Sequence, residues 1–81
     1  MVDLKKMLSD IAKAIVDSPD EVIVIETEEN DNVKLTLHVA KDDMGMVIGK
    51  GGKIAKAIRM VMKAAATTMN KRVVVDIAEN D

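Results

Sequence analysis

Hydrophobic residues near the start of the chain recur at the spacing of one helix face. Four of them stand at positions i, i+4, i+7 and i+11: Leu4, Leu8, Ile11 and Ile15. This is the period of an amphipathic helix. Asp3 is a suitable N-cap, and the residue before Pro19 avoids helical dihedrals. The pattern therefore predicts a helix over residues 3–17.

The next two segments have the composition of paired strands. Residues 21–28, EVIVIETE, contain a β-branched run, which favours a strand. Residues 33–40, VKLTLHVA, alternate hydrophobic and polar side chains, as a half-buried strand does. The polar cluster at 29–32, ENDN, is typical of a turn. The two strands are therefore predicted to form a hairpin.

The second half of the chain predicts two helices and a third strand. Asp42 can cap a short helix over 43–48, which the glycines at 49–52 end. A longer helix is expected over 52–69 and a strand over 72–78, RVVVDIA. On a 100° wheel, one face of the longer helix is predicted to pack on the core. It comprises Ile54, Ala57, Ile58, Val61, Ala64 and Ala65, and the opposite face carries Lys56, Arg59 and Lys63.

The predicted order of elements is helix, strand, strand, short helix, helix, strand, or α-β-β-α-α-β. Strand 72–78 follows strand 33–40 through two helices, so the two are expected to be parallel. A small three-stranded mixed sheet buries one face well, so all three helices should pack on that face. Eighty-one residues suffice for one such α+β domain, spanning 1–81.

Composition narrows the class of protein. The chain has no cysteine and no aromatic residue, so it can form neither disulfides nor thiolate metal sites. Its first sixteen residues, MVDLKKMLSDIAKAIV, mix charged and hydrophobic positions and resemble neither a signal peptide nor a membrane span. A cytoplasmic location is expected.

Charge is distributed unevenly along the chain. The net charge is −2, yet residues 41–72 contain eight Lys and Arg against only Asp42 and Asp43. The preceding forty residues contain four Lys against nine Asp and Glu. A basic central segment within an acidic chain is a local electrostatic feature that can attract an anionic partner.

All four glycines fall within this basic segment, in the stretch 44–54, MGMVIGKGGKI, and three of them lie at positions 49–52. Glycine permits positive φ and close approach of a ligand to the backbone. The cluster leads into the N-terminus of a helix, whose free N–H groups favour an anion. Lys50 and Lys53 add positive charge there. A plain helix–helix turn requires one C-cap glycine and no lysines, so the redundancy favours a phosphate-contacting turn.

Other kinds of site fit the sequence less well. A Walker loop requires Gly-Lys-Ser/Thr, whereas Gly51 follows Lys50, and a dinucleotide fingerprint requires glycine where Ile54 stands. His38 is the only histidine, too few ligands for a metal site. Asp42 and Asp43 are explained by helix capping, with no accompanying nucleophile. We therefore expect no enzyme activity, no cofactor and no metal.

The glycine stretch also resembles a known family. Residues 47–52, VIGKGG, are similar to the VIGxxG core of KH domains, whose glycine loop clamps a four-nucleotide backbone. The element order is similar to that of type II KH domains. The flanking residues DDMG at 42–45 and AKAIR at 55–59 resemble the KhpA family of small bacterial RNA-binding proteins. The signature ends in isoleucine where this chain has Ala55.

The resemblance implies binding of single-stranded RNA in a groove between the glycine loop and the sheet edge. In this groove Gly49 and Gly52 frame the loop, Lys50 and Gly51 are its variable positions, and Ile48 and Ala55 line an apolar floor. Lys53, Lys56 and Arg59 supply adjacent positive charge. The family also implies an RNA-binding or RNA-chaperone role, homodimers, and a heterodimer with a larger KH-containing partner, KhpB.

The absence of aromatic residues affects the expected binding. Stacking of bases on aromatic rings, worth about 1–3 kcal/mol per base, is not possible. One domain should therefore bind RNA weakly and with little sequence preference, and a second chain would raise the effective concentration. An alternative is a protein-interaction module that docks a partner on the same surface.

Overall fold

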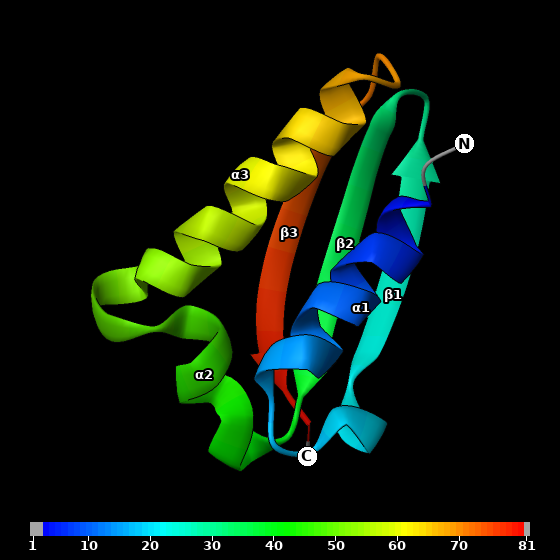
Figure 1. Cartoon of the computed structure of the whole chain (residues 1–81). Helices are drawn as coiled ribbons and strands as arrows, with labels where there is room; N and C mark the ends of the chain where they lie inside the picture. The colour runs from blue at the N-terminus through cyan, green and yellow to red at the C-terminus, as the bar shows by residue number, and fades with distance from the viewer. Residues whose placement is uncertain (1–2, 81) are drawn as a thin grey trace.

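The computed structural model describes residues 3–80, and the elements follow one another in the predicted order (Figure 1). They are α1 (Leu4–Ile15), β1 (Ile23–Glu29), β2 (Asn32–Val39), α2 (Met44–Ile48), α3 (Lys53–Thr67) and β3 (Arg72–Glu79). Short 3₁₀ turns cover Pro19–Glu21, Lys41–Asp43 and Lys50–Gly52.

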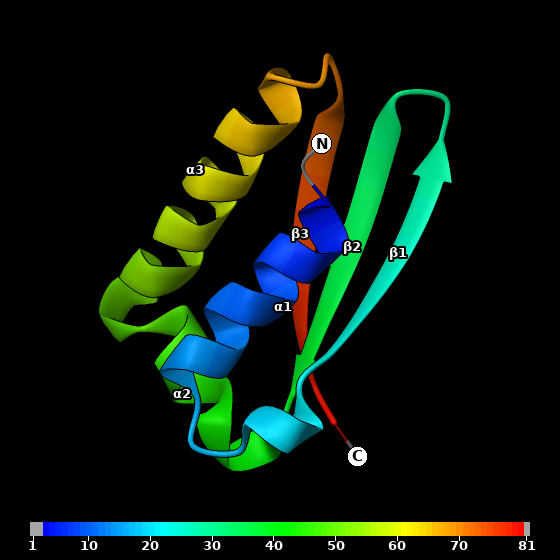
Figure 2. The ribbon, with the colours of Figure 1, turned by 45° about the vertical axis from the view of Figure 1, so that its right-hand side comes forward.

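The three strands form one mixed sheet in the order β1-β2-β3. β1 is antiparallel to β2, with Glu29 opposite Asn32. The turn between them is therefore two residues long, and Asn30 adopts a φ of +57° there. β3 is parallel to β2, with Val33 opposite Val73. All three helices lie on one face of the sheet (Figures 1 and 2), which confirms the predicted α+β fold.

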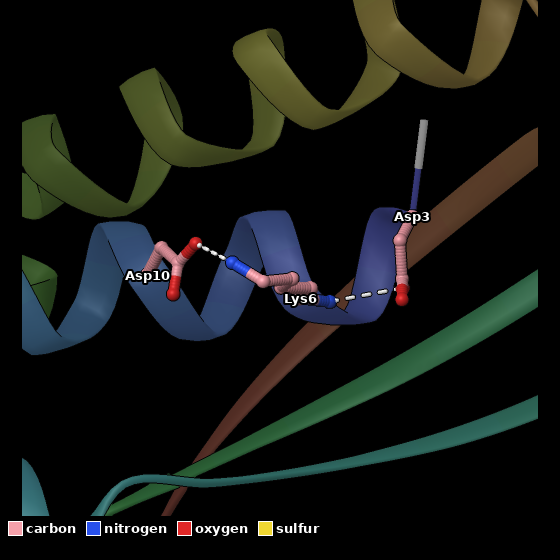
Figure 3. Close-up of polar contacts among 3 residues, drawn as sticks. All are labelled: Asp3, Lys6 and Asp10. Atoms are coloured by element: carbon pink, nitrogen blue, oxygen red, sulfur yellow. Dashed lines mark hydrogen bonds and ion pairs between the residues drawn. The ribbon is translucent and has the colours of Figure 1, made fainter. Parts of the chain in front are cut away.

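α1 begins as predicted but ends early. The Asp3 carboxylate accepts a hydrogen bond from the Lys6 backbone N–H at 3.1 Å, and the Lys6 amine donates to Asp10 at 2.7 Å (Figure 3). This second hydrogen bond, with the charge of the carboxylate, raises the pKa of the Lys6 amine. The helix ends at Ile15, not 17, because Val16 is extended (φ −85°, ψ 161°) and turns its side chain into the core.

The core lies between β2 and the helices. Because β2 is the central strand, its inward side is fully covered, and all four of its hydrophobic residues are buried: Val33, Leu35, Leu37 and Val39. The helices pack against them with Leu4, Leu8, Ala12, Val47, Ile58, Met62 and Ala66. In α1 the small Ala12 is buried while Ile11 and Ile15 are only partly covered.

The buried face of α3 differs from the predicted one. The residues that pack inward are Ala55, Ile58, Met62 and Ala66. Ile54 and Val61, expected in the core, are 37% and 45% exposed. The predicted face was therefore wrong by roughly a quarter of a helix turn, at 100° per residue. Alanines occupy several faces of this helix, so its hydrophobic pattern does not define one orientation.

α3 ends at Thr67, before the predicted end at 69, because a backbone cap closes it. Asn70 adopts a φ of +57°, and the Lys71 backbone N–H donates to the Ala66 carbonyl at 3.0 Å. A hydrogen bond between residues five apart that encloses a left-handed residue is a Schellman-type ending of a helix. It reverses the chain into β3, where the Arg72 N–H donates to the Asp31 carbonyl at 2.9 Å.

Two methionines of α3 test its orientation. Met62 is fully buried and Met60 is 72% exposed. Met62→Ala should lower the free energy of unfolding by about 2–5 kcal/mol, because it leaves a cavity in the core. Met60→Ala should change it by no more than about 0.5 kcal/mol. Urea unfolding of both variants measures this; similar losses for the two would contradict the orientation of α3.

Candidate functional site

The glycine loop joins α2 to α3 and projects at the left edge of Figure 1, away from the sheet. Gly49, Gly51 and Gly52 all have positive φ, at +76°, +65° and +77°. Gly49 combines this φ with a ψ of 173°, a backbone region that essentially only glycine occupies. Part of the glycine cluster is therefore required by the path of the chain itself.

The three glycines of the loop have different surroundings. A Cβ on Gly49 would lie 2.6 Å from Cγ1 of Ile54, closer than carbon atoms can approach. A Cβ on Gly51 or Gly52 would meet no atom within 4 Å. Gly49 thus permits the close packing of the loop on α3, whereas Gly51 and Gly52 leave open space on the outer side of the loop.

The first turn of α3 is arranged to accept an anion. Its N-cap is Gly52, which has no side chain to cap that turn; the Lys53 N–H donates to the Lys50 carbonyl, and no side chain caps the N–H groups that follow. The positive end of the helix dipole lies at the same place. Lys50 and Lys53 flank it, and both side chains are exposed. The backbone and the lysines together create a small positive surface beside open space.

A basic stripe continues from the loop along α3. Lys56, Arg59 and Lys63 are exposed, and on the wheel they lie beside the buried face, on its β3 side, rather than directly opposite it. Arg59 spans the gap between the two elements, since its Nε donates to the carbonyl of Val75 at 3.0 Å. The positive surface therefore extends from the loop to the free edge of β3.

Eight of the nine residues expected at the site lie at least partly at the surface: Ile48, Gly49, Lys50, Gly51, Gly52, Lys53, Lys56 and Arg59. The ninth, Ala55, is only 4% exposed because it belongs to the buried face of α3. Ile48 is 37% exposed at the end of α2, so of the two side chains expected on an apolar floor it alone is open to a ligand.

Asp43 has a structural role that the sequence did not reveal. Its side chain is 2% exposed, and its carboxylate accepts a hydrogen bond from the Ser18 backbone N–H at 3.0 Å. Asp42, the predicted cap, is exposed, and α2 begins without a side-chain cap. Asp43 thereby fixes the start of α2 to the segment that follows α1. No local pattern distinguishes the two aspartates, because the partner is 25 residues away.

Neither a metal site nor a membrane-spanning helix is supported by the described part of the chain. Residues 3–80 bring no three His, Cys, Asp or Glu side chains together around a metal position. His38, the lone histidine, is half-buried on β2. No helix among these residues is long and apolar enough to cross a membrane.

A second surface is hydrophobic and lies on the other side of α3. A groove of about 490 Å³ is lined there mainly by hydrophobic side chains, with Lys53 as the one charged residue: Ile54, Ala57, Ile58 and Val61 of α3, and Ile11 and Ile15 of α1. With the exposed Ala64, the residues Ile54, Ala57 and Val61 follow the spacing i, i+3, i+7, i+10, which is the a/d pattern of a helix–helix seam. We call this surface the apolar seam.

Comparison with known proteins identifies similar sequences over almost the whole chain. The family model described as KhpA/KhpB, KH domain matches residues 5–77. The chain is 58% identical over 74 residues to RNA-binding protein KhpA of Clostridium acetobutylicum, 51% to that of Clostridium perfringens and 46% to that of Oceanobacillus iheyensis. Each alignment covers 91% of this chain and 99% of the relative.

Because Gly49 and Gly45 have different surroundings, alanine at the two positions should change the free energy of unfolding differently. Gly49→Ala should lower the free energy of unfolding by at least about 2 kcal/mol, because alanine is strained at this backbone conformation and its Cβ collides with Ile54. Gly45→Ala is the matched control. It lies within α2 with open space around it and should gain about 0.5–1 kcal/mol. Equal effects in urea unfolding would contradict the geometry of the loop.

Proposed function

Because the chain belongs to the KhpA/KhpB KH-domain family, we propose that it binds single-stranded RNA as a non-catalytic module. The RNA lies between the glycine loop and the free edge of β3, and its phosphates contact the loop. The names of the relatives, each an RNA-binding protein, support RNA as the partner. Weak, non-catalytic binding of this kind would suit an RNA chaperone.

The observation that carries this proposal is the open, positive outer side of the loop. Gly51 and Gly52 leave room for a phosphate to reach the backbone. The first turn of α3 offers N–H groups, and Lys50 and Lys53 supply charge that a phosphodiester would neutralise. A ligand that carries negative charge along a flexible chain could contact this loop and then the basic stripe of α3.

We further propose that the chain forms a homodimer through the apolar seam. A seam of a/d spacing on one helix is complementary to the same seam on a second copy, as a two-fold axis requires. Ile54 and Val61 are exposed large hydrophobic residues on this seam, and burying them would stabilise the pair. A dimer presents two loops to one RNA and so raises the effective concentration of the second site. A larger KH-containing partner of the same family would use the same seam.

The loop is tested by a double charge reversal, Lys50→Asp with Gly51→Asp. The φ of Gly51 is +65° with a ψ of 18°, a left-handed conformation that Asp and Asn tolerate best among residues other than glycine. Two carboxylates would face the RNA backbone, and like charges at such a site cost several kcal/mol. Affinity for a fluorescent single-stranded RNA should fall at least tenfold in an anisotropy titration, while the melting curve stays near the parent's.

A matched control separates charge from shape. The pair Lys50→Asn with Gly51→Asn places side chains of the same size at both positions without negative charge. It should bind RNA more weakly than the parent but more tightly than the aspartate pair. If the folded aspartate variant binds RNA as tightly as the parent, the glycines serve only as a turn. The alternative of a protein-interaction module would then be favoured.

Salt dependence provides an independent measure of the phosphate contacts. Each contact to a single strand contributes about −0.7 to the slope of log affinity against log salt concentration. Lys53→Ala and Lys56→Ala should each flatten this slope by about that amount. Lys5→Ala, on the exposed outer side of α1, should leave it unchanged. An affinity that does not depend on salt would contradict a phosphate clamp.

The dimer is tested by a charge within the apolar seam. Val61→Asp should convert the dimer to a monomer in sedimentation at micromolar concentration, because an unpaired carboxylate would be buried between the helices. Val74→Asp is the matched control, since Val74 is 59% exposed on the open face of the sheet, and it should remain dimeric. A monomeric parent, or a dimeric Val61→Asp, would refute the seam as the interface.

A further inference from the structure

The outer edge of β1 carries backbone groups that no strand satisfies. Within residues 3–80 β1 pairs only with β2, and no element lies beyond its outer edge (Figure 2). The Arg72 N–H donates to the Asp31 carbonyl, so odd-numbered residues along β2 direct their backbone groups to β3 and even-numbered ones to β1. Glu29 lies opposite Asn32, so odd-numbered residues of β1 bond to β2. The even-numbered residues direct their backbone groups outward: Val24, Glu26 and Glu28.

This edge lacks two features that commonly prevent a further strand from pairing. Residues 23–29 contain no proline, and their pairing with β2 continues from one end to the other without a bulge. The outward N–H and C=O groups therefore form a regular row along the strand. Such a row is what an extended peptide pairs with when it adds to the edge of a sheet.

The two sides of the edge differ in chemistry. Val24 is buried under the helices, so strand alternation places Glu26 and Glu28 on the same, helix side of the sheet. Ile23 and Ile25 lie on the open side, and both are about half exposed. A strand added at this edge would therefore place every second side chain beside carboxylates and the intervening ones beside isoleucines.

Charge selects the kind of strand that fits. Residues 20–31, DEVIVIETEEND, contain six acidic residues and no Lys or Arg. Lys71 pairs with Glu28, with 2.6 Å between Nζ and Oε2, whereas Glu26 forms no ion pair within the described residues. A second copy of β1 would bring like charges together at this edge, which is unfavourable. A segment with basic residues at alternate positions is complementary to it.

We propose that the outer edge of β1 docks an extended protein segment in which basic residues alternate with aliphatic ones. The segment adds a fourth strand to the sheet, bonded to the outward backbone groups of β1. Its basic side chains lie on the helix side beside Glu26, and its aliphatic side chains lie on the open side beside Ile23 and Ile25. Basic arms are common on proteins that bind nucleic acid. The surface is separate from the glycine loop, so this inference does not depend on the proposed binding of RNA.

The test titrates the full chain, without RNA, into a fluorescent peptide of about eight residues, the length of an ordinary strand. The peptide alternates lysine with valine, and binding is measured by anisotropy. Two control peptides separate charge from pattern: one alternates glutamate with valine, and the other has the lysines grouped at one end. Each control should bind at least about tenfold more weakly, because one reverses the charge pairing and the other loses the alternation. Equal binding of the three peptides would refute the proposal.

Methylation of the peptide amides tests the backbone pairing. In an antiparallel addition the lysines lie opposite Glu26 and direct their N–H groups to β1, whereas the valines direct theirs away. N-methylation of every lysine should then abolish binding, and N-methylation of every valine should be tolerated. In a parallel addition the two results are exchanged, so the pair of peptides also identifies the orientation. Loss of binding in both peptides, or in neither, would overturn the added strand.

Amide hydrogen exchange locates the docked peptide on the parent protein, without any variant. With saturating lysine–valine peptide the N–H groups of Val24 and Glu26 should exchange at least about fivefold more slowly, because they gain hydrogen-bond partners. The N–H groups of Val73 and Val75 are the control. They alternate with the Arg72 N–H, which bonds toward β2, so they lie at the other edge of the sheet and should not change. Protection at β3 in place of β1 would contradict the proposed site.

A charge reversal on β1 tests the role of the exposed Glu26. Glu26→Lys should weaken the lysine–valine peptide about tenfold and strengthen the glutamate–valine peptide. Glu79→Lys makes the same change of charge at the exposed end of β3, and it should leave both affinities within about twofold of the parent's. If a folded Glu26→Lys keeps the parental affinity for both peptides, the carboxylate does not select the partner and the proposal fails.

The double variant Lys50→Asp with Gly51→Asp separates this surface from the RNA site. It should bind the lysine–valine peptide as tightly as the parent does, because the loop lies away from β1. A large change in peptide affinity would place the peptide at the loop and refute the edge of β1 as its site. Peptide binding at β1 by a chain that binds no RNA would leave this inference standing while the proposed function fails.

Discussion

The close packing of α3 on the sheet is the constraint that arranges every other surface of the molecule. Ile58, Met62 and Ala66 of this helix are buried in the same core cluster as the strand residues, and Ala55 is buried nearer the glycine loop. Once this stripe is buried, the remaining two sides of the helix are fixed. The basic stripe lies toward β3 and the apolar seam lies toward α1. If the helix were rotated about its axis, the basic stripe would no longer face β3 and the apolar seam would no longer face α1.

The glycine loop is coupled to this packing through Ile54. Because Gly49 has no Cβ, Ile54 can lie against the loop backbone, and its side chain is shared between the loop and the apolar seam. The loop, the start of α3 and the proposed dimer surface are therefore adjacent. Asp43 supports the same region from the other side by fixing α2 to the Ser18 backbone. The proposed RNA site is thus positioned by packing and by one partly buried hydrogen bond.

A net charge of −2 does not conflict with RNA binding in this fold, because opposite charges occupy different places. Lys50, Lys53 and the basic stripe lie on the loop and on α3, whereas much of the acidic character is carried by β1 and the segment before it. At physiological ionic strength the Debye length is about 8 Å, so charges on the far side of the molecule have little effect at the loop. The absence of aromatic rings leaves phosphate contacts, apolar contacts and base-edge hydrogen bonds as the sources of affinity.

The sequence by itself determined the order of elements, the hairpin, the parallel third strand and the glycine loop. The hairpin and the loop follow from local signals, namely alternation in 33–40, the turn residues at 29–32 and three glycines within 49–52. The parallel strand follows from the two helices that connect it to strand 33–40. The family resemblance added the expected groove. Tertiary structure alone decided which face of α3 is buried, since the many alanines of that helix fit more than one orientation. It also decided the partners of Asp43 and Arg59, because Ser18 and Val75 lie 25 and 16 residues away and only the folded chain brings them into contact.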